Sequence, residues 1–287
     1  MQDHEENFKS LGESLKRSLN HLGIDDFEGY SPAEMSEILY QPLEDSCPVR
    51  LNKVDEDVYR QIPMLNLVRY IISRIRESGK LKLTITGKLP VKLVADSYAQ
   101  GFMKDELLEF GSYKLYKEED SISIHLAHIL LQLTGMVRKS KGYLYLTKKG
   151  EKLTTQPYDL LRTVLLAFGQ QFNWSYFDGY GDQPIGKIGW LYSLLLVRKY
   201  GAISRPSNFY AEKYLLAFPT LTDVVENGRA ANCYKIRSFD RFMFVFGLIT
   251  IEKDHWMDSA KEVKATPLLF SLFNLDPPGN YQYPEIN

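Results

Sequence analysis

The sequence predicts an α+β protein that is mainly helical and contains two winged-helix-like repeats, each with a core of three helices and a β-hairpin, the wing. The prediction depends on a pattern that occurs twice: a helix opened by proline, a short β run, a second helix, and a third helix followed by a hairpin. The first copy begins at Pro63 and the second at Pro184. Hydrophobic residues make up 44% of the 287 residues, enough for two ordinary cores.

The first repeat opens with a helix that we expect to end at Gly79. Its apolar residues recur every three or four positions, and glycine favours the residue after a helix. The alternating segment 80–84 predicts an edge strand. Pro90 begins the second helix, and the third helix runs from about Ser121 to Gly135.

The wing of the first repeat lies in MVRKSKGYLYLT, residues 136–147. Two β-prone runs flank a glycine turn, which is typical of a hairpin. Because successive side chains of a strand point to opposite faces, Tyr143 and Tyr145 share one face and Leu144 and Leu146 share the other.

The second repeat has the same order of elements. We expect a helix from Pro184, a strand in GAIS (201–204), a helix in NFYAEKYLLAF (208–218), and a third helix that leads into a longer hairpin over 248–266. Between the repeats, Asp159–Phe172 predicts a linker helix, and an aromatic loop follows it.

These patterns divide the chain into three parts. Residues 1–60 form an acidic helical extension and linker, 61–156 the first winged-helix-like domain, and 157–287 a linker helix, aromatic loop and second winged-helix-like domain. In the extension, Ser31 and Glu34 form a predicted capping box for a short helix.

The extension also carries a helical pattern over 8–22 and a proline-containing segment, 41–63, that predicts a linker. Residues 1–60 hold 14 acidic and 6 basic side chains, a net charge of −8, which leaves +7 on the rest of the chain. Either the acidic extension shields the basic body from polyanions, or it is simply a solvated surface.

Composition disfavours several classes of protein. No apolar run approaches the roughly 20 residues that cross a bilayer, and the acidic N-terminus lacks the apolar core of a secretion signal. We therefore expect a cytoplasmic protein without a membrane partner. Cys47 and Cys233 form no C-x-x-C pair, which argues against a disulfide framework and a thiolate zinc site.

The sequence contains no convincing catalytic, metal or cofactor motif. Residues 181–188, GDQPIGKI, match a phosphate-binding loop, but Ile188 stands where Ser or Thr must hold magnesium. His125 and His128 lie three residues apart on one helix, yet no third ligand accompanies them, and histidines that bond within a fold are commoner. We expect a non-enzymatic protein with no catalytic residue, no metal and no cofactor.

The strongest functional signal is the basic wing of the first repeat. Residues 138–152 contain six basic side chains and one acidic side chain, Glu151, so the local net charge is +5. Wings contact phosphates in many DNA complexes, and about four such contacts would give a slope of log affinity against log salt of about −3.6. Lysine-rich hairpins also protect sheet edges, and this alternative stays open. The candidate residues are Arg138, Lys139, Lys141, Lys148 and Lys149, with Lys152 beside them.

The third helices differ between the repeats. Residues 121–135 offer no Arg or Lys for base edges, so we expect no sequence-specific readout there. The corresponding helix of the second repeat adds Lys235, Arg237 and Arg241 as candidate contacts. The predicted partner is DNA or RNA, bound with weak sequence specificity.

The alternative is a protein-interaction or scaffold module that uses the same fold without binding DNA. Aromatic residues are favoured anchors at interfaces, and the loop between the repeats supplies Trp174, Tyr176, Phe177 and Tyr180. A competing interpretation is that these rings fill the seam between the repeats.

Nine short stretches carry a family resemblance over a span of roughly 190 residues, among them SPAEMSEILYQP, IPMLNLVRYI, FNWSYFDGY and QPIGKIGWLYSLLLVRKYG. In these stretches the chain resembles a group of uncharacterised bacterial proteins, some of which carry a cysteine-rich zinc-binding SEC-C motif. This chain lacks their cysteine cluster, so the zinc role is not carried over. The resemblance implies a soluble bacterial protein and supplies no catalytic residue.

Overall fold

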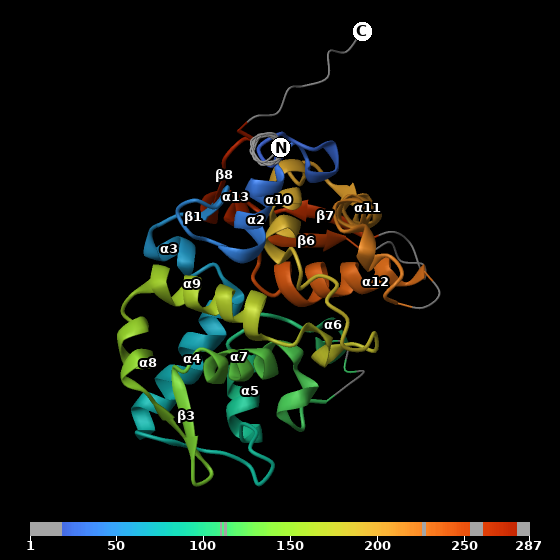
Figure 1. Ribbon diagram of the computed structural model, residues 1–287. Helices are drawn as coiled ribbons and strands as arrows, with labels where there is room; N and C mark the ends of the chain where they lie inside the picture. Colours follow the sequence, from blue (N-terminus) through green and yellow to red (C-terminus); the bar gives the residue numbers. More distant parts are fainter. Residues whose placement is uncertain (1–18, 110, 112–113, 226–227, 253–260, 280–287) are drawn as a thin grey trace, which may run out of the picture.

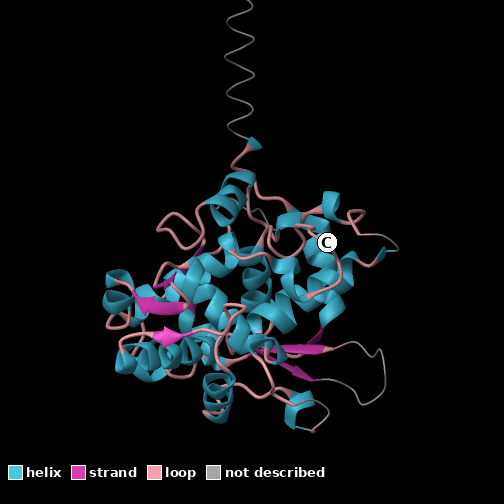
Figure 2. Ribbon diagram, turned by 90° about the horizontal axis from the view of Figure 1, so that it is seen from below, coloured by secondary structure: helices cyan, strands magenta, loops and turns pink. Residues whose placement is uncertain are grey.

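The computed structural model has an α+β fold in which helices predominate and strands form small antiparallel sheets (Figures 1 and 2). Among the described residues, no helix is long and apolar enough to pass through a bilayer. Most of the helix expected over 8–22 falls outside what can be described. The structure describes the chain except for residues 1–18, 110, 112–113, 226–227, 253–260 and 280–287.

The first structural unit has the order of elements that the sequence predicts. Its first helix begins at Pro63 and ends at Gly79, which adopts the left-handed conformation with φ 71°. The apolar stripe of this helix is fully buried against the third helix. The elements are α4 (Pro63–Ser78), β2 (Leu81–Lys82), α5 (Val91–Ala99), α7 (Ile122–Leu133), β3 (Val137–Ser140) and β4 (Tyr143–Leu146).

A tight turn closes the expected hairpin of the first unit. Lys141 and Gly142 both have positive φ, 48° and 77°, as a two-residue hairpin turn requires. Strand β4 lies in the centre of the sheet, paired with β3 on one side and with β2 on the other, so the strand order is β2-β4-β3. In Figure 1 this hairpin extends from the lower part of the molecule, away from the second unit.

The second structural unit repeats this order of elements, and its strand order, β5-β7-β6, corresponds to that of the first. Its first helix begins at Trp190 rather than Pro184, because Gly186 and Gly189 hold the intervening segment in turns with positive φ. The short strand lies just after GAIS rather than within it. The elements are α10 (Trp190–Tyr200), β5 (Arg205–Pro206), α11 (Ser207–Ala217), α12 (Ala230–Lys235), the π-helical η7 (Ile236–Met243), β6 (Ile249–Glu252) and β7 (Glu262–Ala265).

A linker helix lies between the two units (Figure 1). It consists of α9 (Pro157–Leu166) and a π-helical continuation, η3 (Ala167–Gln171), close to the helix expected over 159–172. Phe168 on η3 packs against Phe242 of the second unit and against Trp174 of the aromatic loop, with ring centroids 5.0 and 4.8 Å apart. Because η3 also packs against α7 of the first unit, the linker contacts both units.

The N-terminal extension packs on the second unit, where α2 (blue in Figure 1) lies beside α10. The capping box of α2 is confirmed, with the Ser31 amide donating to Glu34 over 2.8 Å and the Glu34 amide donating to the Ser31 hydroxyl. The segment expected to be a linker instead contains β1, which pairs antiparallel with β8 near the other end of the chain. The elements are α2 (Pro32–Tyr40), β1 (Val49–Leu51), α3 (Glu56–Tyr59), α13 (Pro267–Leu272) and β8 (Phe273–Leu275).

Buried polar contacts fix the extension in place. The Tyr30 hydroxyl donates to the carbonyl of Asp276 over 2.6 Å. The Glu28 carboxylate accepts from the ammonium groups of Lys199 and Lys213, at 2.8 and 2.6 Å, and from the Tyr200 hydroxyl. The shorter elements of the fold are η1 (Asp25–Phe27), α6 (Glu106–Glu109), η2 (Glu118–Asp120), α8 (Lys148–Leu153), η4 (Trp174–Phe177) and η5 (Pro219–Leu221).

Candidate nucleic-acid interface

The register of the first hairpin defines an inner and an outer face of its sheet. Residues that face each other across an antiparallel pair share a face, and Leu144, which is fully buried, lies opposite Lys139 and Leu81. The inner face therefore packs on the core. Alternation assigns Lys82, Arg138, Ser140, Tyr143 and Tyr145 to the outer face.

Eight exposed cations gather on this sheet and on α8, which follows it. Within the described part of the chain, none of them takes part in an ion pair. The local acid, Glu151, is paired with Arg76 of α4 at 2.9 Å and leaves the neighbouring lysines uncompensated. These cations form the basic surface: Lys80, Lys82, Arg138, Lys139, Lys141, Lys148, Lys149 and Lys152.

A second loop contributes to the basic surface through Gly87, between β2 and α5. The ammonium of Lys139 lies so close to this glycine that a Cβ added there would be 2.1 Å from it. Gly87 also has φ 79°, which disfavours any other residue. The Lys139 side chain thus extends from the hairpin to the β2–α5 loop and brings its charge to that loop.

The described residues of the second unit do not provide a comparable surface, and the expectation for Arg237 is wrong. This side chain is fully buried and pairs with Asp178, with 2.6 Å between Nε and Oδ2. Its remaining N–H groups donate to backbone carbonyls, so it has no N–H group left to donate to a phosphate. Lys235 and Arg241 are partly buried, and the Lys235 ammonium donates to the side chain of Asn208 over 2.7 Å.

Both third helices are largely covered. In α7, residues 124–128 are all buried, and the helix packs against α4, α5 and the linker η3. In the second unit, Arg237, Ser238 and Phe239 of η7 are buried as well. Little of either helix is therefore exposed for contact with base edges.

The aromatic loop belongs mainly to the core, which corrects the placement of Trp174 on an interaction surface. Trp174 is 4% exposed, and its indole N–H donates to the carbonyl of Phe168 over 2.9 Å. Phe177 and Tyr180 are partly buried and pack against the core, and the guanidinium of Arg229 lies 4.7 Å from the Tyr180 ring centroid. Tyr176 remains 54% exposed.

A buried polar cluster around Glu118 was not expected from the sequence. The Glu118 carboxylate is fully buried and accepts from His128 Nδ1 at 2.9 Å and from the backbone amide of Leu89. His125 Nε2 lies 2.8 Å from the Lys88 ammonium. Because an ammonium only donates, His125 accepts and is neutral. Burial is the largest cause that lowers its pKa.

This cluster ties the β2–α5 loop to α7, and its residues line a cavity of about 420 Å³. The two histidines, expected to bond within the fold, both do so: His128 bonds Glu118, and His125 accepts from the Lys88 ammonium. Among the residues that the structure describes, no three His, Cys, Asp or Glu side chains are grouped so as to hold a metal ion. The acidic run before α7, residues 118–120, is the one sequence signal that could have identified the partner.

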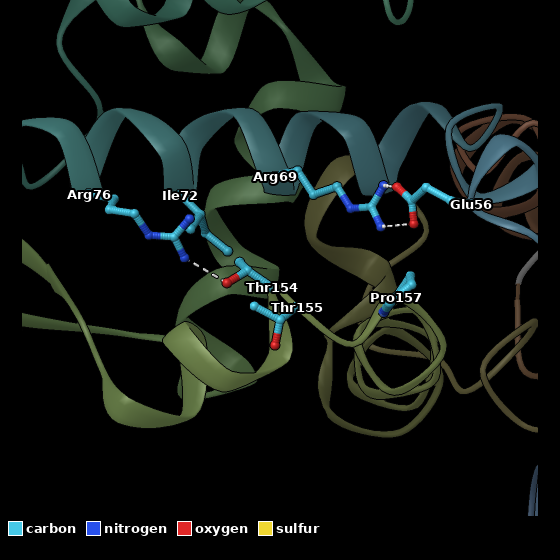
Figure 3. Close-up of a pocket in the computed structure, with 7 residues that line it drawn as sticks. All are labelled: Glu56, Arg69, Ile72, Arg76, Thr154, Thr155 and Pro157. Atoms are coloured by element: carbon cyan, nitrogen blue, oxygen red, sulfur yellow. Dashed lines mark hydrogen bonds and ion pairs between the residues drawn. The ribbon is translucent and has the colours of Figure 1, made fainter.

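Two other anion-site candidates are already satisfied by internal contacts. In the cleft of about 390 Å³ between α4 and the α8–α9 junction, Arg69 pairs with Glu56 and Arg76 donates to Thr154 (Figure 3). In the loop over 181–188, the amide of Gly186 donates to the Tyr214 hydroxyl over 3.0 Å, which removes a donor that a phosphate would need.

A comparison with known families gives a match within the chain. A family model described as the Y4jL N-terminal domain matches residues 60–159, about a third of the chain. The matched span begins just before α4 and ends at the start of α9, so it contains the first structural unit with its hairpin. No curated protein and no solved structure matches the chain.

Proposed function

We propose that this protein is a non-enzymatic, tandem winged-helix protein that binds nucleic acid through the first wing with weak sequence specificity. The shared order of elements and the shared strand order of the two units support the winged-helix assignment. We also propose, from the sequence stretches given above, a relationship to the bacterial group that includes some SEC-C proteins.

The observation that carries the function is the basic surface. Its eight cations are exposed and lack ion pairs among the described residues, whereas Lys199, Lys213 and Arg237 of the second unit are held by internal carboxylates. Uncompensated cations grouped on one small sheet and the helix that follows it bind polyanions by releasing counterions from the phosphate backbone. Because both third helices are covered, binding of this kind would depend on phosphates rather than on base edges.

Charge reversal tests the proposal. Replacing Arg138, Lys139 and Lys141 by Glu removes three phosphate contacts, which should flatten the slope of log affinity against log salt by about 2.7 and abolish retention on heparin. The matched control reverses three exposed lysines away from the wing, K53E, K114E and K264E. Unchanged retention of the wing variant, or equal loss in the control, refutes the proposal.

A second candidate is a protein-interaction module that uses the same fold as a scaffold. The burial of both third helices favours it, because a fold whose third helix is covered can still bind a protein partner through its other surfaces. Of the aromatic loop, Tyr176 is the ring that remains half exposed as an anchor. This candidate replaces the first if the charge-reversal variant and the native protein both fail to bind DNA and RNA at low salt.

A further inference from the structure

The outer face of the first hairpin sheet presents two tyrosine rings side by side. Tyr143 and Tyr145 lie two residues apart on β4 and are partly exposed, with ring centroids 6.4 Å apart and an angle of 53° between the rings. In the described part of the chain, each of these rings has the other as its aromatic neighbour. We refer to this pair as the tyrosine face.

Cations of the basic surface border the tyrosine face. The Lys80 ammonium lies 4.5 Å from the centroid of Tyr143, and the Arg138 guanidinium lies 4.7 Å from that of Tyr145. Lys82 stands directly opposite Tyr143 across the β2–β4 pair. Aromatic rings interleaved with cations on an exposed sheet are the arrangement that binds single-stranded nucleic acid, since rings stack on bases and cations attract phosphates.

We propose that the tyrosine face stacks on the unpaired bases of a single-stranded nucleic acid whose phosphates lie along the basic surface. This inference rests on the proposed function and names its substrate class. It predicts a preference for single strands over duplex, which the cations alone would not produce.

The spacing of the rings supports a single strand over a duplex. The 6.4 Å between the ring centroids is nearly twice the rise of about 3.4 Å between bases stacked in a strand of duplex DNA. Two neighbouring bases that each lie on one ring are therefore separated from one another. A single strand adopts such a splayed form easily, whereas base pairing and stacking prevent it within a duplex.

The test compares the affinity of the full chain for a short single-stranded oligonucleotide with its affinity for a duplex of the same length, by fluorescence anisotropy. Replacing both Tyr143 and Tyr145 by Ala should weaken single-strand binding at least about 10-fold, because each stacked base contributes severalfold or more. Duplex affinity and the salt slope should hardly change, since no phosphate contact is lost.

Two controls separate stacking from folding. The Y143F and Y145F double variant keeps the rings and should retain single-strand affinity, and Tyr40→Ala removes a more exposed tyrosine on α2, outside the first unit. If the double Ala variant does not fold, the double Leu variant keeps apolar bulk without an aromatic ring and should show the same selective loss.

The outcomes distinguish this inference from the function on which it rests. If the charge-reversal variant loses all binding while the tyrosine variants lose single-strand and duplex affinity equally, or lose neither, the tyrosine face is refuted and the basic surface stands. If charge reversal leaves binding unchanged, both proposals fall.

Discussion

Truncating Arg237 should cost this protein a large part of its stability without affecting the basic surface. The guanidinium is fully buried and forms two contacts with Asp178, 2.6 Å from Nε to Oδ2 and 3.1 Å from Nη2 to Oδ1. It also donates to the carbonyls of Gly181 and Ile185, at 2.9 and 3.2 Å, and to that of Gln183. One side chain thus holds the loop between η4 and α10 against η7.

The magnitude follows from what Arg237→Ala leaves behind. The Asp178 side chain is 4% exposed, so its charge would remain buried without a partner. Removing one member of a buried ion pair costs about 3–5 kcal/mol, and the orphaned carbonyls add to this loss. For a chain of this size, about 4 kcal/mol corresponds to a fall in Tm of about 10 °C.

Urea unfolding and calorimetry of a double-mutant cycle measure the effect. Arg237→Ala and Asp178→Ala should each be strongly destabilising, and the double variant should lose much less than their sum. Arg237→Lys should cause an intermediate loss of stability, because the lysine ammonium cannot form the paired hydrogen bonds of the planar guanidinium. A loss below about 1 kcal/mol for Arg237→Ala, or an additive cycle, would show that the pair is solvated and refute this account.

Two further predictions concern the seam and the polar cluster. Trp174→Ala should lower the free energy of unfolding by about 3–5 kcal/mol, because it leaves a cavity beside Phe168 and Phe242 and removes an indole hydrogen bond; a folded variant with unchanged Tm would return Trp174 to the candidate interaction surface. The second concerns pH. The pKa of His125 is lowered, chiefly by burial, assisted by Lys88 and His128 and opposed by Glu118 and Glu119. The unfolded chain therefore takes up a proton near the ordinary histidine pKa of about 6.5, while the folded chain does not. Stability should accordingly fall as the pH drops below about 6.5, and His125→Gln should weaken this fall, whereas His21→Gln, at an exposed histidine, should not; equal pH profiles for native protein and His125→Gln would contradict the assignment.

Local signals predicted most of the first unit. Proline at a helix start, glycine at its end and alternation in a hairpin act over a few residues, so Pro63, Gly79 and Tyr143 could be placed without knowledge of the rest of the chain. The basic charge of the first hairpin was predictable for the same reason, because its cations are neighbours in the sequence. The start of α10 was missed because turns at Gly186 and Gly189 displace it from the proline.

The buried polar side chains were not predictable in the same way. Arg237 carries the same charge as Lys139, and the sequence gives no sign that one is buried and the other exposed. The difference depends on Asp178, which lies 59 residues away in the chain. Glu118 was missed because its role depends on contacts with the backbone amide of Leu89, in the β2–α5 loop, and with His128 on α7.

The sequence by itself determined the order of the elements, the hairpin of the first unit and the charge of its surface, because hydrophobic periodicity, turn residues and neighbouring charges are local properties of the chain. Only the tertiary structure decided which cations remain uncompensated, that the third helices are covered, and that β1 pairs with β8 across more than 200 residues. These features arise from contacts between segments distant in sequence, and burial and pairing are properties of such contacts rather than of any single segment.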